Sequence, residues 1–376
     1  MSPVAHSALA ALAAFFITGA VAQKFPEVPL NDKRFEYDQL PYRVDTDVGL
    51  ERGEQYGYNI CNSTTEGPES RCQTAIINSI EDFCLWGPPE PNSVVGDTEG
   101  EAVAYCTQPG RGTRLIPRGA LTGVQFTRTP DYIQVVGFID QTQINMQADD
   151  SGGEMDPHGA DLRGNPMGGL LYTEAWSGSF QQVIQWHNFM GNNYFCLKAC
   201  DPAGSNDRRF CEHIFDRIGC YYNAPSNAQD GVFESCLGDS QDFPGVYTDA
   251  AGAVQTYTQP PEELGPITSM PYQPKVPASS SCTQYESSSI YAALASVEPS
   301  GSGPAGSAGT SASPTSGGGA ATSGRPTDTL GTNRPTNTGS SSGTAEGSQS
   351  TDNGAVAIGV SGLSVMGVVL SAIFLL

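Results

Sequence analysis

Cysteine is the residue that most constrains how this chain can fold. Ten cysteines lie within a span of just over two hundred residues, and the number is even. In an oxidising compartment an even set predicts a disulfide framework, so we expect five disulfides. No pair has the Cys-x-x-Cys spacing that is typical of zinc sites. The sequence leaves the pairing open. The ten residues are Cys61, Cys72, Cys84, Cys106, Cys196, Cys200, Cys211, Cys220, Cys236 and Cys282.

The N-terminus predicts export to such a compartment. Residues 8–21 are apolar, and Ala20-Val21-Ala22 has the small-residue pattern of a signal-peptide cleavage site. The segment before the apolar run holds no Lys or Arg, which departs from the usual signal. The run is short for a membrane span. We therefore interpret residues 1–22 as a secretory signal peptide.

The C-terminus predicts a lipid anchor. Residues 355–376 are uncharged, and the small residues Asn353-Gly354-Ala355 precede them. This arrangement is typical of a signal for a glycosylphosphatidylinositol (GPI) anchor, with attachment at Asn353 and removal of 354–376. The short spacer leaves Gly347 or Ser348 as alternatives. A membrane-spanning tail is the other interpretation, but the basic flank of a stop-transfer helix is missing.

Composition divides the chain between these ends into two parts. Residues 23–293 hold every cysteine and tryptophan, and we interpret them as a folded ectodomain. Residues 294–353 consist mainly of Ser, Thr, Gly, Pro and Ala, and cannot bury enough apolar surface to offset the entropy of ordering. We expect this segment to be a disordered, O-glycosylated stalk.

Charge excludes one class of partner. The chain carries 18 basic and 40 acidic residues, a formal charge of −22, and has a sequence pI near 4.3. Such a chain is repelled by phosphate backbones, so nucleic-acid binding is excluded.

Hydrophobic patterning favours strands. Four segments rich in β-branched and aromatic residues are separated by Gly and Asn, and we expect strands in 131–146, 168–176, 180–190 and 192–201. Helical spacing of apolar residues predicts helices over 73–86 and 207–219, the second capped by Asn206 or Asp207 and ended by Gly219. The balance predicts a mainly β, disulfide-rich, sandwich-like domain with minor helix.

Few motifs point to chemistry. Asn62-Ser63-Thr64 is the one Asn-x-Ser/Thr sequon found in the ectodomain, and it predicts N-glycosylation. The histidines His158, His187 and His213 form no recoverable catalytic triad, and no Gly-x-Ser-x-Gly elbow occurs. We expect His187 and His213 to be packing residues.

The segment 149–161, "DDSGGEMDPHGAD", is the strongest candidate for a site. It could hold a metal through Asp156, His158 and Asp161, although the acidic residues do not follow the order of an EF-hand loop. The interpretation favoured here is a structural loop, in which Asp side chains satisfy turn amides and glycines adopt positive φ.

Carboxylate pairs for glycoside hydrolysis are a further alternative. The acidic residues considered for such a pair are Glu99, Glu101 and Glu174. Trp86, Trp176 and Trp186 could stack on sugars, although packing in the core is the simpler expectation. We assign no catalytic residue and expect no cofactor.

Several phrases taken together resemble one family. "NICNSTTEG", "DFCLWGPPEPNS", "DPHGADLRGNPMGGL", "QWHNFMG", "CLKACDPAG" and "CEHIFDRIGC" look like the fungal macrophage-activating glycoproteins over residues 50–290. The resemblance implies a secreted or surface-tethered fungal glycoprotein, and it supplies no catalytic residues.

The expectation is therefore a non-enzymatic, extracellular glycoprotein of the cell surface or cell wall, GPI-anchored to the plasma membrane, with a role in adhesion or host immune-cell recognition. Wall polysaccharide or host lectins are the expected contacts. Two alternatives stay open, namely a secreted carbohydrate-active or metal-dependent enzyme, and a lectin-like glycan-binding head.

Overall fold

The computed structural model describes residues 25–296, which lie within one compact unit, Met1–Ala305. The predicted signal peptide, Asn353 and the tail 354–376 lie outside the described residues, as does nearly all of the predicted stalk. Those predictions, and the domain boundaries drawn from them, stay predictions.

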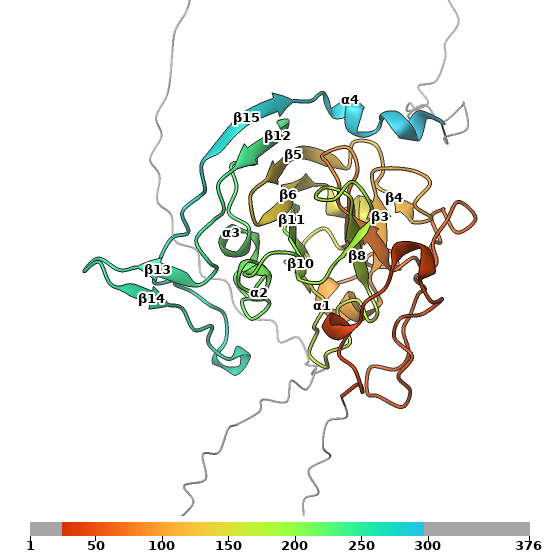
Figure 1. Ribbon diagram of the computed structural model, residues 1–376, viewed down its shortest axis with the longest axis horizontal. Helices are drawn as coiled ribbons and strands as arrows, with labels where there is room; N and C mark the ends of the chain where they lie inside the picture. The colour runs from red at the N-terminus through yellow and green to blue at the C-terminus, as the bar shows by residue number, and fades with distance from the viewer. Residues whose placement is uncertain (1–24, 297–376) are drawn as a thin grey trace, which may run out of the picture. The chain divides into compact units, whose positions relative to one another are not determined.

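A seven-stranded sheet dominates the described residues (Figure 1). Its neighbouring strands are antiparallel except for one parallel pair, β12 with β5. In spatial order the strands are β15 (Ser279–Gln284), β12 (Phe233–Gly238), β5 (Leu121–Arg128), β6 (Tyr132–Ile139), β11 (Tyr194–Cys200), β10 (Trp186–Gly191) and β7 (Gly153–Met155).

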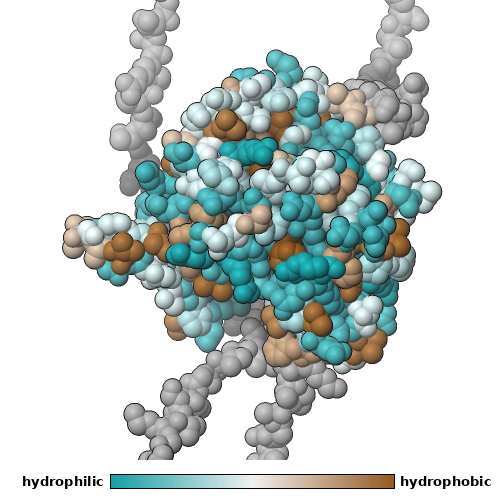
Figure 2. Space-filling model, in the orientation of Figure 1, coloured by the Kyte–Doolittle hydropathy of each residue, from teal (hydrophilic) through white to brown (hydrophobic). Residues whose placement is uncertain are grey.

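Three smaller sheets accompany it. Two have three strands, namely β1 (Thr74–Ile76), β8 (Leu170–Thr173) and β9 (Gln181–Val183), and β2 (Cys84–Gly87), β3 (Val103–Cys106) and β4 (Arg114–Leu115). The third is the hairpin β13 (Val246–Thr248) and β14 (Val254–Thr256), which projects at the left of Figure 1 and bears brown, hydrophobic surface in Figure 2.

Helices are short. The α-helices are α1 (Val95–Thr98), α2 (Asp207–Phe210), α3 (Gly219–Asn223) and α4 (Ser287–Ile290). The 3-10 helices are η1 (Leu30–Asp32), η2 (Tyr37–Gln39), η3 (Glu99–Glu101), η4 (Gln141–Ile144), η5 (Glu262–Leu264) and η6 (Ala292–Ser296). The prediction of a mainly β, disulfide-rich domain with minor helix is confirmed.

The two faces of the large sheet differ in chemistry. Alternate residues of each strand point to opposite faces. One face is apolar and belongs to the main core, with Phe126, Val135, Phe195, Leu197, Trp186, Met190 and Met155. The opposite face carries Gln125, Gln134, Lys198, His187 and Glu154 among a few apolar residues. Both faces are buried, so the polar face must be covered by other parts of the chain.

The apolar face packs on the β2–β3–β4 sheet, which gives the sandwich-like layering. Trp86 of β2 stacks on Trp186 of β10 with ring centroids 5.8 Å apart. Asn188, which points inward from β10, accepts a hydrogen bond from the Trp86 main-chain N–H at 2.8 Å. The predicted packing role of these two tryptophans is confirmed, since they are 0% and 1% exposed.

All ten cysteines form disulfides. Each pair joins residues that are close in sequence, with separations of 11 to 46 residues. The pairs are Cys61–Cys72, Cys84–Cys106, Cys196–Cys220, Cys200–Cys211 and Cys236–Cys282. Two of them fasten the segment that holds α2 and α3 to strand β11, and this segment covers part of the polar face.

The helix predicted over 73–86 is wrong. The segment forms β1 and β2, joined by a turn in which the Asn78 side-chain amide donates to Asp82 at 2.7 Å. The helical spacing was misleading because Ile76, Ile77 and Phe83 are all buried, on both sides of the chain. A segment buried all round has no polar face to reveal its period.

The helix predicted over 207–219 is interrupted. Only Asp207–Phe210 is helical before the turn at Cys211, and Gly219 begins α3 instead of ending the first helix. The disulfides of Cys211 and Cys220 hold the two ends of this stretch on β11, so a continuous helix does not form. The Asn206 side chain makes no capping hydrogen bond.

The strands predicted in 131–146, 168–176 and 192–201 are found as β6, β8 and β11, with shorter bounds. The single strand predicted over 180–190 is wrong, because the segment divides into β9, which pairs with β8, and β10, which pairs with β11 in the large sheet. The segment 131–146 leaves the sheet after Ile139, where Asp140 accepts from the Thr142 main-chain N–H and starts η4. Across residues 25–296, no helix has both the length and the apolar character needed to cross a membrane.

Candidate functional site

A cavity of about 920 Å³ opens beside β7, at the edge of the large sheet. The loops on either side of β7, the end of β10 and the α2–α3 segment contribute to its wall. Five acidic residues and one arginine line it, so its chemistry is strongly acidic. The acidic residues are Glu99, Glu154, Asp156, Asp216 and Glu262.

Glu154 is the most deeply buried of these acids. It lies in β7 opposite Phe189 of β10, so its side chain leaves the sheet on the polar face. The residue is 5% exposed, and its Oε1 has no hydrogen-bond partner. This oxygen has almost no accessible surface and lies 3.8 Å from His187 Nδ1, beyond hydrogen-bond distance. Burial lowers the pKa of His187 well below its usual value, so the ring is neutral. The unpartnered oxygen of Glu154 therefore faces the buried His187 ring.

Glu99 reaches the same cavity from η3. Its Oε2 accepts from the Asn165 side-chain amide at 2.9 Å, and the Asn165 Oδ1 accepts from Arg52 at 2.6 Å. A Cβ added at Gly153 would lie 2.1 Å from Glu99 Oε1. Glycine at 153 therefore leaves room for Glu99 against the β7 backbone.

Asp156 forms the start of the loop that follows β7. Its Oδ1 accepts from the main-chain N–H of His158 at 2.6 Å and of Gly159 at 3.0 Å, which is an Asx turn. Two main-chain hydrogen bonds of 2.8 Å between Asp156 and Asn165 close the loop at its base. The other carboxyl oxygen of Asp156 is not used by the turn.

Two histidines stack at the side of this loop. His158 and His213 lie with ring centroids 3.5 Å apart and planes within 9° of parallel. His158 Nε2 also contacts Gln185 Oε1 at 3.1 Å. Burial lowers the pKa of both rings, for His213 to about 4, and the proximity of His158 adds to the lowering at His213. Both imidazoles are therefore neutral near neutral pH, which permits the close stack.

Burial and mutual repulsion shift the acids in the opposite direction. Burial raises the pKa of Glu99 to about 8, and the neighbouring Asp156 adds to the rise. Burial raises the pKa of Asp156 to about 6, against the lowering effect of its turn hydrogen bonds. The pKa of Glu154 is raised well above its usual range by burial and by Asp156. At neutral pH the group holds both protons and negative charge.

The three residues predicted to hold a metal, Asp156, His158 and Asp161, do not converge on one point. Asp161 pairs with the Arg52 guanidinium and also contacts Arg163, while His158 faces Gln185. Among residues 25–296, the one group of three potential ligands with atoms within 4.8 Å is Glu234, Cys236 and Cys282, and the last two are joined as a disulfide. Metal binding by Asp156, His158 and Asp161 stays a prediction.

The loop predicted over 149–161 is found on either side of β7, whereas Gly153–Met155 in its middle forms that strand because it pairs with β10. Asp150 accepts from Gly152 and Val95 main-chain N–H groups at 2.9 and 2.8 Å. Gly152 and Gly159 have φ of +88° and +61°. The same segment also places Asp156 in the wall of the cavity.

The other residues considered from the sequence, Glu101, Glu174 and His187, do not line the acidic cavity. Glu101 is exposed and Glu174 half-buried. His187 is 0% exposed, and neither ring nitrogen has a hydrogen-bond partner. The contribution of Glu154 was missed as an acid–base candidate, although its position between "GG" and "MD" on an expected turn was visible in the sequence.

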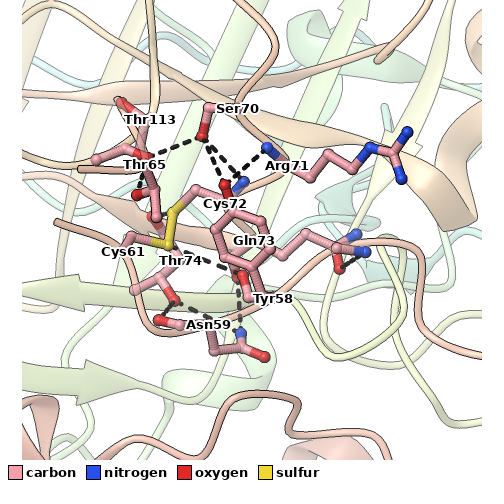
Figure 3. The surroundings of a disulfide bond; sticks show 12 residues. Tyr58, Asn59, Cys61, Thr65, Ser70, Arg71, Cys72, Gln73, Thr74 and Thr113 are labelled. Atoms are coloured by element: carbon pink, nitrogen blue, oxygen red, sulfur yellow. Dashed lines mark hydrogen bonds between the residues drawn. A yellow bond between two sulfur atoms is a disulfide. The ribbon is translucent and has the colours of Figure 1, made fainter. Parts of the chain in front are cut away.

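The glycosylation sequon occupies an exposed turn directly after Cys61. Figure 3 shows the Cys61–Cys72 disulfide with Thr65 and Ser70 beside it. Asn62 Oδ1 accepts from the Thr64 hydroxyl at 2.7 Å and from the Thr64 main-chain N–H at 2.9 Å. Thr65 and Ser70 both donate to the Gly112 carbonyl at 2.8 Å and fix the turn on the domain. The Asn62 side chain is therefore presented to solvent on a rigid base.

Comparison with known proteins gives two relatives from Mycosarcoma maydis. The chain is 45% identical over 216 residues to appressorium protein ROW2, covering 56% of this chain and 73% of ROW2. It is 44% identical over 246 residues to appressorium protein ROW1, covering 62% of this chain and 57% of ROW1, little more than half of that relative. No family model and no solved structure matches the chain.

These relatives confirm the fungal character of the resemblance drawn from the sequence, while membership of the macrophage-activating glycoproteins stays a prediction. The identity to ROW2 extends over most of that protein. The chain therefore belongs to the family of fungal proteins that includes the appressorium protein ROW2.

Proposed function

We propose that this protein is a non-enzymatic glycoprotein of the fungal cell surface or wall, which presents a disulfide-stabilised head on a glycosylated stalk. The observation that carries the proposal is the pairing of all ten cysteines. Complete pairing is typical of chains that fold in an oxidising compartment, and it agrees with the signal peptide predicted at residues 1–22.

The Asn62 turn supports glycosylation of the head. A transferase must reach the side-chain amide, and this amide lies on an exposed turn whose Asx geometry brings the Thr64 hydroxyl to Asn62 Oδ1 at 2.7 Å. O-glycans on the Ser- and Thr-rich residues 294–353 complete the proposed coat.

The proposed tether is the GPI anchor at Asn353. An expanded stalk of about fifty residues then holds the head away from the plasma membrane. Adhesion or recognition by host immune cells is the proposed role, with wall polysaccharide or host lectins as partners. The names of ROW1 and ROW2 place those proteins in the appressorium and state no reaction, which supports a role without turnover.

The anchor is tested by expressing the full chain, and a variant that ends at Asn353, in a fungal host with a tag after residue 22. We expect the full chain on the cell surface, released by phosphatidylinositol-specific phospholipase C, and the shortened variant in the medium. A shortened variant that remains in the membrane fraction would contradict the proposal. Peptide N-glycosidase is expected to lower the mass of both forms, and Asn62→Gln to remove that shift.

A further inference from the structure

A second cavity, of about 360 Å³, opens beside strands β3 and β4, and it shares no lining residue with the acidic cavity. Much of its wall is apolar, because four proline rings and a leucine contribute to it. These residues are Pro68, Pro89, Pro91, Pro117 and Leu115. An apolar cavity of this size with a few polar groups is typical of a site for a small organic molecule.

Arg114 of β4 brings a buried positive charge to this cavity. The residue is 5% exposed, and its Nε donates to the Ser70 carbonyl at 2.9 Å. Its Nη1 donates to the Pro89 carbonyl at 2.7 Å and to the Tyr105 hydroxyl at 3.0 Å. Within residues 25–296, no carboxylate oxygen lies within 4.0 Å of its guanidinium nitrogens. A buried charge with neutral partners only is unfavourable, so the site favours an anion that pairs with it.

The third nitrogen of this guanidinium is available to a ligand. Nη2 of Arg114 makes no hydrogen bond within the described part of the chain and, unlike Arg163 Nη1, it is not enclosed. Because Arg114 lines the cavity, the accessible part of its side chain meets that space. The bonds of Nε and Nη1 and the Tyr105 ring, whose centre lies 5.4 Å from the guanidinium carbon, fix the group. Nη2 is therefore a positioned donor at the cavity wall.

Two glutamates also line this cavity, but their charges act more weakly than that of Arg114. Glu69 and Glu90 are both exposed, and Glu90 Oε1 lies 3.4 Å from the Tyr56 hydroxyl. Water and salt screen exposed charges, whereas a buried charge is screened much less. A carboxylate that accepts from Nη2 therefore gains more from the Arg114 charge than it loses by repulsion from the two glutamates.

We infer that this cavity binds a small organic acid, in its carboxylate form, whose body is apolar. The carboxylate accepts a hydrogen bond from Arg114 Nη2 and supplies the opposite charge, while the apolar body packs against the proline rings and Leu115. The inference goes beyond the proposed surface role. Binding in solution depends neither on the anchor nor on glycans, so the two proposals can fail separately.

The experiment is titration of the purified full chain with phenylacetate at pH 7 and low salt, followed by NMR of the ligand. Phenylacetamide has the same shape without the charge, acetate lacks the apolar body, and glucuronate has a polar body. We expect phenylacetate to bind at least tenfold more tightly than each of these, and its affinity to fall with added salt. Equal binding of phenylacetamide would overturn the role of charge. Equal binding of acetate or glucuronate would overturn the role of the apolar wall, and absence of phenylacetate binding would overturn the whole inference.

Variants locate the site. Arg114→Gln removes the charge, and in protein shown to be folded by thermal melting it should abolish the preference for phenylacetate over phenylacetamide. Because Arg114 is buried, that variant can fail to fold, so a second variant changes exposed residues only. The double variant Glu69→Gln, Glu90→Gln removes repulsion and should strengthen phenylacetate binding at least twofold at low salt. The control Glu263→Gln is exposed and lies outside the cavity wall, and should not change binding. Weaker or unchanged binding in the double variant would overturn the assignment.

Discussion

At the scale of single residues, the buried acids beside β7 make the stability of the fold depend on pH, because burial raises their pKa values. The folded protein retains a proton on Glu99 up to about pH 8, whereas the ordinary value is 4.5. The folded state thus binds more protons than the unfolded chain between these values. The contribution of Glu99 to stability is complete below pH 4.5 and is lost as the pH rises through 8.

Glu99→Gln tests this directly, because glutamine keeps the neutral form and has no proton to lose. We expect the variant to gain stability over the unmodified protein as the pH rises from 5 to 8, by roughly 1–3 kcal/mol at pH 8. Urea unfolding at several pH values measures the difference, with exposed Glu101→Gln as the matched control. Parallel pH curves for Glu99→Gln and the unmodified protein would show that Glu99 titrates normally.

At the scale of elements, disulfides decide how the polar face of the large sheet is covered. The segment with α2 and α3 has little regular structure of its own, and Cys196–Cys220 and Cys200–Cys211 attach it to β11. Beneath it, Lys198 is completely buried, and its ammonium group contacts Asn223 and Gln241. Burial lowers the pKa of Lys198, so this covering also controls the charge beneath it.

Replacing both Cys196 and Cys220 by serine should cost about 3 kcal/mol, the value expected for a closed loop of this length. The loss of amide-exchange protection should concentrate in residues 201–223, because that segment loses a tether, and urea unfolding gives the total. The matched control is the Cys61–Cys72 pair changed to serines, which should leave 201–223 protected. Equal loss of protection there in both variants would argue against a local tether.

At the scale of the whole described domain, the stack of Trp86 on Trp186 joins the β2–β3–β4 sheet to the large sheet. Trp86 and Trp186 come from different sheets and stack in the core, fully or almost fully buried. Each ring fills the space between the layers, and a smaller side chain would leave a cavity that the strands cannot easily close.

Trp86→Ala is therefore expected to destabilise the protein by about 3–5 kcal/mol. Trp176 is a useful control, because it is half-buried and packs at the margin of the same core. Trp176→Ala should cost clearly less in denaturant unfolding. A similar cost for both substitutions would indicate that the interlayer contact has no special weight.

The sequence by itself determined the properties that depend on composition and on near neighbours. The even cysteine count and the N-terminal pattern predicted disulfides, and the β-branched and aromatic residues of 131–146 predicted the strand that is found as β6. The turns at Asp150 and Asp156 in the segment 149–161 were predicted because Asx turns and positive φ are decided within two or three residues, whereas β7 between them depends on pairing with β10.

Only the tertiary structure decided what depends on contacts between distant residues. Burial on both sides turned the expected helix at 73–86 into β1 and β2, since long-range strand pairing outweighs local spacing. The same packing placed Glu99 near Glu154 and His213 against His158, although the residues of each pair are 55 positions apart in the sequence. Their pKa shifts arise from that burial and proximity, which no local stretch of sequence contains.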